Sequence, residues 1–387
     1  MKSNYKKLGE FIRPISVRNI DESVGLLLGL SVQKKFISSI ANTIGTDMRT
    51  YKIIVKNQFA YIADTSRRGD KIGIALLENY DRAIISQAYD IFEVIDTQQL
   101  SPEYLMMWFR RPEFDRYARF KSHGSVRELF SWEDLCETEL PVPSIEKQLE
   151  IVAEYNTLQN RISLNKQLIN TLEATAQAIY KQWFVDFEFP DQNGLPYKSN
   201  GGEMIDSPLG EIPKGWEVQT IGDMAEIKAG GDRPKTFSEN KTDKCPIPIY
   251  SNGVTNNGLY GYTDKHNYPK NTITISARGT IGFSVLRNED FDAIVRLLVL
   301  IPKFSNSVIY LWQNIKKIEF DNSGSVQNQL TIPQVSVLSI IMPEREVLKK
   351  YQPLLMLVYQ KINIYLTENQ KLVEFQSLLL SRLSTLI

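Results

Sequence analysis

The chain has few of the side chains that build catalytic and metal centres. Among its 387 residues there are only two histidines, His123 and His266, and two cysteines, Cys136 and Cys245. Neither histidine has a metal-ligating neighbour at a useful spacing, and the cysteines lie far apart. The sequence therefore indicates no zinc knuckle, no other metal centre and no disulfide framework.

The sequence also lacks the motifs that hold nucleotides and methyl donors. It contains no G-x-x-x-x-G-K-S/T loop, which cradles the phosphates of a nucleotide, and no Asn/Asp-Pro-Pro-Tyr/Phe motif of the kind that surrounds a flipped base. We therefore expect this chain to carry no catalytic constellation and to bind no cofactor itself.

An excess of charge of one sign and long apolar runs are missing as well. The 45 lysines and arginines balance 45 acidic residues, whereas nucleic-acid-binding proteins are often basic. Any affinity for DNA must then come from local clusters or from a basic partner. No apolar run approaches the ~18 residues of a membrane span, and the N-terminus leads into no signal-peptide core, so we expect a cytoplasmic protein with no membrane partner.

What the chain does contain is an internal repeat. From Gly124 onward it repeats itself at an offset of 200 residues without a gap, so that Gly-Ser-Val at 124–126 returns at 324–326 and Pro143 returns as Pro343. A duplicated unit presents two similar surfaces related by an approximate two-fold axis. Such a pair suits a ligand with the same symmetry, and duplex DNA is the commonest one.

Each copy predicts a globular head followed by a long helix. Runs rich in β-branched residues predict strands, and short amphipathic runs predict helices packed on them, so the heads should be mixed α and β. Strands are expected at 51–55, 83–85, 272–275 and 293–295, and short helices at 104–109 and 310–315. The expected domains are a first head at 1–143, a first long helix at 144–186, a linker at 187–211, a second head at 212–343 and a second long helix at 344–387.

The long helices carry a heptad pattern in one register. A single amphipathic helix of this length cannot bury its whole seam in its own head, so the two helices should pair. The first must carry the chain to the second head and the second can only run back, which predicts an antiparallel coiled coil with one head near each end. The seam includes Leu158, Ile162, Ile169, Leu172 and Ile179 in the first helix and Val358, Ile362, Leu372 and Leu379 in the second.

Polar residues and a proline interrupt this pattern. Asn165 and Asn369 could fix the register of the pair, or they could reach solvent at the edge of the seam, which we favour. Pro353 cannot sit unstrained inside a helix, so the second helix should begin or kink there. The aromatic run 183–187 is expected to pack as core on the helix pair rather than to form a partner interface.

Several loops carry the residue types that contact DNA. Arginine, lysine, asparagine and glutamine read base edges, while cations and hydroxyl groups bind phosphates. The alternative is that Gly69 and Gly279 form tight turns whose neighbouring arginines only pair with carboxylates. The DNA-binding candidates are Arg67, Arg68, Lys71, Lys121, Ser125 and Arg127 in the first head, and Arg233, Lys235, Asn252, Asn256, Asn257 and Arg278 in the second.

These features together resemble a known family. Two heads, each closing with a Gly-Ser loop and an apolar segment that ends in proline before a long helix, resemble the specificity subunit of type I restriction-modification systems. The phrases Ala-Ile-Tyr-Lys-Gln-Trp-Phe-Val-Asp-Phe at 178–187 and Gly-Glu-Ile-Pro-Lys-Gly-Trp at 210–216 also match. The resemblance covers essentially the whole chain. It implies an α+β fold with two mixed α/β target recognition domains, two long antiparallel coiled-coil helices and a pseudo-two-fold repeat.

The resemblance also implies partners. Each head would read one half of a split site in double-stranded DNA, and the helix pair would be both spacer and docking platform. Two methyltransferase subunits would bind one specificity subunit, and restriction subunits would join to make the nuclease. S-adenosylmethionine, ATP and Mg would be held by those partners and not by this chain.

Two other interpretations come from different classes. A stand-alone metal-dependent nuclease could use Pro190-Asp191 with Glu226-Ile227-Lys228, but the aspartate lies in the linker and the triplet in the next domain. A coiled-coil adaptor without nucleic acid would explain the helices but not two heads with loops rich in arginine, lysine, asparagine and tyrosine.

Overall fold

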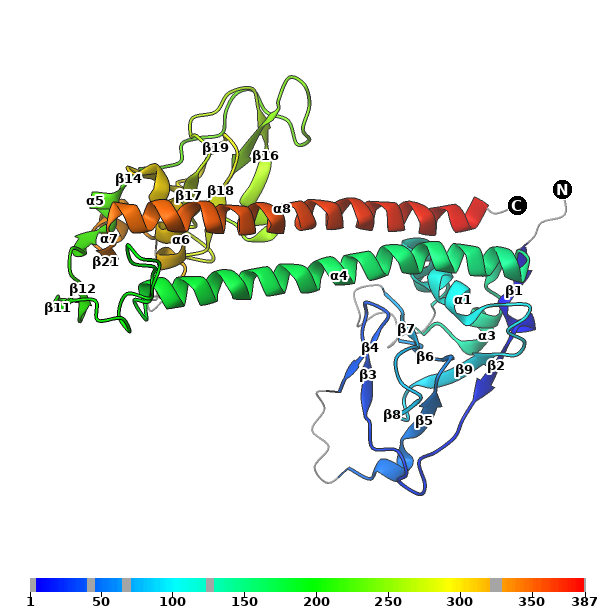
Figure 1. The fold of residues 1–387 in the computed structure, drawn as a ribbon. Coiled ribbons are helices and arrows are strands. Elements are labelled where there is room, and N and C mark those ends of the chain that lie inside the picture. Colours follow the sequence, from blue (N-terminus) through cyan, green and yellow to red (C-terminus); the bar gives the residue numbers. More distant parts are fainter. Residues whose placement is uncertain (1–4, 40–45, 65–70, 123–128, 321–328, 386–387) are drawn as a thin grey trace. The chain divides into compact units, whose positions relative to one another are not determined.

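The computed structural model describes residues 5–39, 46–64, 71–122, 129–320 and 329–385. The chain forms two compact units, one made of Met1–Lys166 with Leu366–Ile387 and the other of Gln167–Tyr365. Each unit therefore contains one head and one half of each long helix (Figure 1). No helix among the described residues combines the length and apolar character that a membrane span requires.

The first head is built on a four-stranded antiparallel sheet in the order β2-β9-β6-β7. These strands are β2 Ile12–Ile15, β9 Asp90–Val94, β6 Gln58–Ile62 and β7 Gly73–Leu76. Two-stranded pairs surround it: β1 Tyr5–Lys7 with β10 Glu139–Pro141, β3 Leu28–Leu30 with β4 Phe36–Ser38, and β5 Lys52–Val55 with β8 Arg82–Ile85. The helices of this head are α1 Pro102–Phe109, α2 Pro112–Lys121 and α3 Trp132–Cys136.

The second head repeats this plan with the sheet order β14-β20-β17-β18. These strands are β14 Ala225–Ala229, β20 Leu298–Pro302, β17 Thr272–Ile275 and β18 Ser284–Arg287. The smaller sheets are β13 Glu217–Thr220 with β21 Ser339–Met342, β11 Met204–Ile205 with β12 Ile212–Pro213, and β16 Leu259–Thr263, β15 Ile247–Tyr250 and β19 Asp292–Ala293 together. Its helices are α5 Ile221–Met224, α6 Val308–Ile315 and α7 Ile332–Ser336.

The repeat seen in the sequence extends to individual hydrogen bonds. In each head a buried tyrosine of the helix on the sheet donates its hydroxyl to a carbonyl of the strand that leads into the long helix. In the first head Tyr104 donates to Pro141 at 3.1 Å, and in the second Tyr310 donates to Ile341. The two heads are therefore copies of one α+β fold, as the sequence predicted.

Most of the short elements expected from the sequence are present, with one exception. The strands expected at 51–55, 83–85 and 272–275 correspond to β5, β8 and β17, and the expected short helices lie in α1 and α6. The strand expected at 293–295 is wrong, because β19 ends at Ala293 and Val295 has a left-handed backbone with φ of 55°. The apolar run 293–295 indicated a buried strand, but the backbone turns at Val295.

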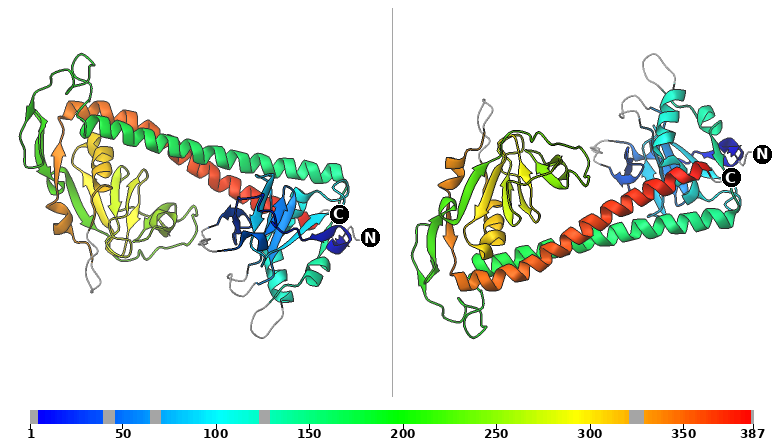
Figure 2. Two further views of the ribbon diagram at one scale, coloured as in Figure 1. Left: turned by 90° about the horizontal axis from the view of Figure 1, so that it is seen from below. Right: turned by 90° about the horizontal axis from the view of Figure 1, so that it is seen from above.

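The long helices are α4 Ile145–Phe184 and α8 Arg345–Arg382, and a 3-10 turn, η6 Leu383–Thr385, follows α8. In the first unit Ile151 near the start of α4 and Leu383 after the end of α8 share one core. In the second unit Trp183 near the end of α4 packs on Tyr351 near the start of α8, with ring centroids 5.5 Å apart. The helices therefore pair antiparallel (Figure 2). None of the seam residues named above is exposed.

The second long helix begins upstream of its proline. It starts at Arg345 and continues through Pro353, so the expectation that the helix begins at this proline is wrong. Tyr351 and Leu355, on either side, are fully buried in the core of the second unit, whereas Pro353 is exposed. Proline removes one helical hydrogen bond, and the carbonyl that loses it belongs to exposed Lys349, where water can replace the donor.

The seam of the first unit contains a buried polar contact. Asn165 has no exposed surface, so the interpretation that it reaches solvent is wrong. Its amide donates to Asn369 Oδ1 at 2.9 Å and to Glu368 Oε2 at 3.1 Å, and Glu368 in turn accepts from Arg161 at 2.8 Å. The asparagines face each other across the seam, so each becomes the other's partner.

We expect N369L to lower the free energy of unfolding by about 1 to 3 kcal/mol, because the fully buried Asn165 amide loses an acceptor. The double variant N165L/N369L should recover most of this loss, because replacing both partners by apolar groups leaves no unsatisfied amide. Urea denaturation of both variants measures the difference. Equal stability of N369L and the double variant would contradict a buried, paired asparagine.

The aromatic side chains at the end of α4 and directly after it are core, as expected. Phe184 and Phe187 are buried, and Phe187 packs edge-on against Trp216 with ring centroids 5.7 Å apart. Phe189 stacks between Trp216 at 4.9 Å and Tyr197 at 4.7 Å. The segment expected as a linker is thus anchored to the second unit by its aromatic side chains.

Candidate nucleic-acid interface

In the second head the side chain of Asn252 joins three segments of the chain. Its Nδ2 donates to the carbonyl of Val295 at 2.7 Å, and its Oδ1 accepts from the backbone N–H of Ala277 at 2.7 Å. Ala277 directly precedes Arg278. The amide of this predicted DNA-binding residue is therefore engaged within the head, where it positions its neighbours.

Arg278 lies exposed at the start of a tight turn. Gly279 has a φ of 70°, a conformation that favours glycine. The Arg278 guanidinium donates to Gln329 Oε1 at 2.6 and 3.2 Å. The turn suggested by the glycine is present, but the partner of the arginine among the described residues is a neutral amide rather than a carboxylate.

Asn256 and Asn257 form an exposed loop, η4 Thr255–Gly258, with left-handed backbones. Asparagine adopts this conformation more readily than other residues with a side chain, so the backbone alone gives one reason for their identity. Buried Arg287 supports the loop by donating to the carbonyl of Asn257 at 2.8 Å. Its guanidinium lies 3.6 Å from the ring centroid of Tyr250, and burial lowers its pKa to about 10.

Arg233 and Lys235 follow β14 on an exposed segment. The Arg233 guanidinium lies over the ring of Phe237, 5.0 Å from its centroid. Upstream, Gly230 passes so close to the turn after β19 that a Cβ atom would lie 2.7 Å from the carbonyl carbon of Ala293. The glycine therefore permits a close approach between this segment and residues 293–296.

In the first head only Lys71 and Lys121 of the candidates can be described. Lys71 is exposed, and the next residue, Ile72, donates its backbone N–H to Asp115 Oδ1 at 3.2 Å. Asp115 also pairs with buried Lys34 at 2.9 Å. Burial lowers the pKa of Lys34, and Asp115 opposes the shift.

Lys121 is half-buried at the end of α2, 6.0 Å from the ring centroid of Tyr117. The remaining candidates of this head, Arg67, Arg68, Ser125 and Arg127, lie outside the described residues.

Comparison with known proteins places this architecture in a family. The family described as "Type I restriction modification DNA specificity domain" matches residues 213–374. The chain is 23% identical over 449 aligned positions to the type I restriction enzyme HindI specificity subunit of Haemophilus influenzae, with 97% of both chains covered. The chain belongs to the specificity subunits of type I restriction-modification systems. It is accordingly the non-catalytic DNA-recognition component of such a system.

Other relatives agree with this assignment. The specificity subunit is 26% identical to the MjaIX specificity subunit of Methanocaldococcus jannaschii over 70% of this chain and 65% of the relative. Its fold matches the crystal structure of a type I S subunit from M. genitalium with a TM-score of 0.65 at 15% identity, covering 98% of this chain and 95% of that one. The architecture of two heads and long helices is thus a shared fold.

The residues that suggested a nuclease do not assemble into a metal site. The Asp191 carboxylate accepts the backbone N–H groups of Asn193 at 2.7 Å and Leu195 at 2.9 Å within its own turn. Glu226 pairs with Lys228 on the exposed side of β14 at 3.1 Å. Among the described residues, no group of three or more metal-ligating side chains comes together.

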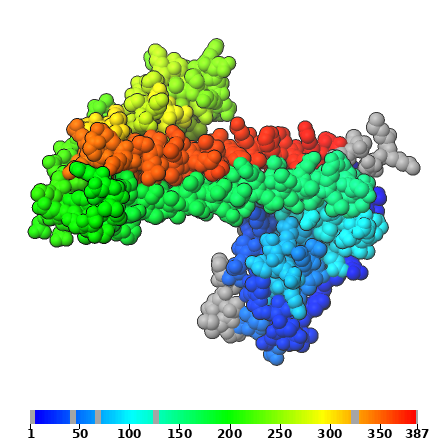
Figure 3. Space-filling view, in the orientation of Figure 1, coloured from blue at the N-terminus to red at the C-terminus, as the bar shows by residue number. Residues whose placement is uncertain are grey.

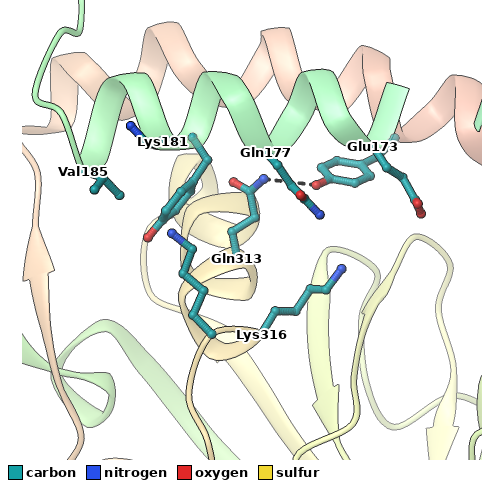
Figure 4. A pocket seen from close by; sticks show the side chains of 9 residues that line it. Glu173, Gln177, Lys181, Val185, Gln313 and Lys316 are labelled. Atoms are coloured by element: carbon teal, nitrogen blue, oxygen red, sulfur yellow. Dashed lines mark hydrogen bonds between the residues drawn. The ribbon is translucent and has the colours of Figure 1, made fainter. Parts of the chain in front are cut away.

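A pocket of about 600 Å³ lies in the second unit between α4, α6 and α8 (Figure 4). Its lining includes Lys316 and Lys317 at the end of α6, where cations are favoured by the helix dipole. Lys317 Nζ lies 3.7 Å from the ring centroid of Tyr180, and Gln313 donates to the Tyr359 hydroxyl at 3.1 Å. None of the predicted DNA-binding residues lines this pocket.

Proposed function

We propose that each head of this specificity subunit reads one half of a bipartite site in double-stranded DNA, and that α4 and α8 set the spacing of the halves. The observation that carries the proposal is the duplicated fold, in which both heads have the same strand order and the same tyrosine hydrogen bond. Two copies of one reading surface fit two half-sites. The exposed candidates Arg233, Lys235 and Arg278 supply suitable donors for bases and phosphates.

The helix pair also offers a docking surface, and we assign it to two methyltransferase subunits. Helix α8, drawn orange to red in Figure 3, forms part of the visible surface. It exposes many large apolar side chains, including Leu357 at 67% and Leu378 at 59%. Large contiguous apolar patches on a protein surface mark interaction sites. Restriction subunits would then join the complex. S-adenosylmethionine, ATP and Mg would be bound by these partners, which fits the lack of nucleotide and methyl-donor motifs in this chain. The exposed apolar set comprises Leu354, Leu357, Ile364, Leu366, Val373, Phe375 and Leu378.

The purified chain alone should neither cut nor methylate DNA, and co-expression with its methyltransferase should give a complex with two methyltransferase copies per chain. We expect L357E/F375E to lower this ratio, because it places charges on the apolar surface of α8. L209E, at a similarly exposed leucine outside α8, serves as the control. Native mass spectrometry gives the ratio.

Two results would contradict this proposal. One is metal-dependent cleavage or methyl transfer by the purified chain. The other is a stable monomer that binds its DNA site tightly without methyltransferase.

A further inference from the structure

The turn between β19 and β20 holds two consecutive residues in the left-handed region. Val295 has a φ of 55° and Arg296 a φ of 61°. Such a conformation is unfavourable for every residue other than glycine. It is least favourable for a β-branched side chain such as valine. The turn is therefore strained, and contacts with neighbouring segments must keep its backbone in this conformation.

Hydrogen bonds from neighbouring segments hold the turn in place. The N–H of Val295 donates to Gly231 at 2.9 Å, and the N–H of Arg296 donates to Gly230 at 3.2 Å. The carbonyl of Val295 accepts from Asn252 Nδ2 at 2.7 Å. The backbone of both strained residues is thus fixed by contacts from outside the turn. A strained conformation persists only when its surroundings determine it in this way.

The strain presents two side chains to solvent. Val295 is 49% exposed and Arg296 is exposed. Among the described residues, no hydrogen bond or ion pair involves the Arg296 guanidinium. Glycine at both positions would remove the strain. An exposed arginine held in such a turn is explained by a use for its side chain.

Asn252 connects this turn to a second exposed arginine. The same amide that holds Val295 also binds the N–H of Ala277 at 2.7 Å, and Arg278 follows directly. One side-chain amide thus sets the backbone positions beside both arginines. Arginine binding to O6 and N7 of guanine is the commonest specific contact in the major groove, and it requires a guanidinium held on a fixed backbone.

We propose that Arg296 is a specificity-determining residue of the second head and that it reads a guanine in the half-site. This inference rests on the proposed function of the heads as DNA readers. It adds a residue that the sequence pattern does not single out, since Arg296 ends an apolar run that predicts a strand.

The test is R296Q in the complete complex with its methyltransferase, with methylated bases sequenced in the DNA of expressing cells. We expect recognition to relax at one guanine of the half-site read by the second head, while the other half and the gap remain unchanged. In binding assays the preference for that guanine should fall about 10- to 100-fold, the discrimination that a bidentate contact provides.

Two control variants separate a base contact from other effects. K265A removes an exposed charge on the segment that follows β16. The last residue of β16, Thr263, pairs with the first residue of β15, Ile247, whereas Asn252 follows the other end of β15. This variant should keep the target sequence. V295G relieves the strain but retains Arg296 and should keep the guanine.

Unchanged specificity of R296Q would overturn the proposal. So would an equal loss of affinity for all sequences with a weaker salt dependence, which indicates a phosphate contact. A wild-type complex that methylates no split site would instead refute the proposed function, so the two failures are distinguishable.

Discussion

Replacing residues 167–365 of this specificity subunit with the corresponding segment of another family member is expected to change one half of the methylated sequence completely and to leave the other half intact. This segment is one compact unit, with its own head and its own halves of both long helices. Because its core is complete, the graft carries its reading surface with it. Sequencing of methylated bases in expressing cells shows which half has changed.

A smaller graft, residues 212–343, provides the informative comparison. It leaves Phe184 and Tyr351 of the host against a foreign core, although Phe184 lies only 4.5 Å from Tyr310 and 5.9 Å from Trp216 between ring centroids. Mismatched packing typically costs 1 to 3 kcal/mol, so this graft should melt earlier than the larger one. A change in both halves of the site with the larger graft would disprove modular reading.

Lengthening both long helices by one heptad should widen the unspecified gap of the target site while both recognised halves stay the same. Seven residues add ~10 Å at 1.5 Å per residue, which corresponds to at most about three base pairs at 3.4 Å each. A whole heptad keeps the apolar seam in phase. The gap can be read directly from the methylated sites.

The insertion points follow from the division of the chain. One heptad goes between Lys166 and Gln167 and the other between Tyr365 and Leu366, where the two units meet in sequence. The contact of Asn165 with Asn369 then stays within its own unit. A single insertion in α4 is the control, and it should destabilise the chain because the partner helix is not extended. An active double-insertion variant that methylates sites with the original gap would show that the helices do not set the spacing.

The sequence predicted the architecture because the repeat and the heptad pattern depend on many residues at once. A heptad pattern such as that from Leu158 to Ile179 still predicts a helix when one residue departs from it. For the same reason, Pro353 does not interrupt α8. Packing of Tyr351 and Leu355 in one core outweighs the hydrogen bond lost at the proline. Local propensity was therefore a poor guide where tertiary burial was strong.

The interface was less predictable, because it depends on how loops fold back on one another. Asn252 looked like a base-reading residue from its polar turn, but its amide binds Ala277 and Val295, which are distant in sequence. The sequence did not indicate Arg296 as a DNA-binding residue, because an apolar run precedes it and predicts a strand. Nothing in the sequence indicates that Val295 has a left-handed backbone. The left-handed turn is evident only from the hydrogen bonds that Gly230, Gly231 and Asn252 make with it.

The composition of the two units has a consequence for the order in which they can form during synthesis. The second unit is one continuous stretch, residues 167–365, whereas the first needs residues 366–385 as well. Leu383 enters the core of the first head, and the hydroxyl of Tyr5 donates to the carbonyl of Ser384 at 2.9 Å. The first head is therefore synthesised first but completes its fold last. The apolar seam at the start of α4 stays exposed to solvent until the end of α8 has been translated.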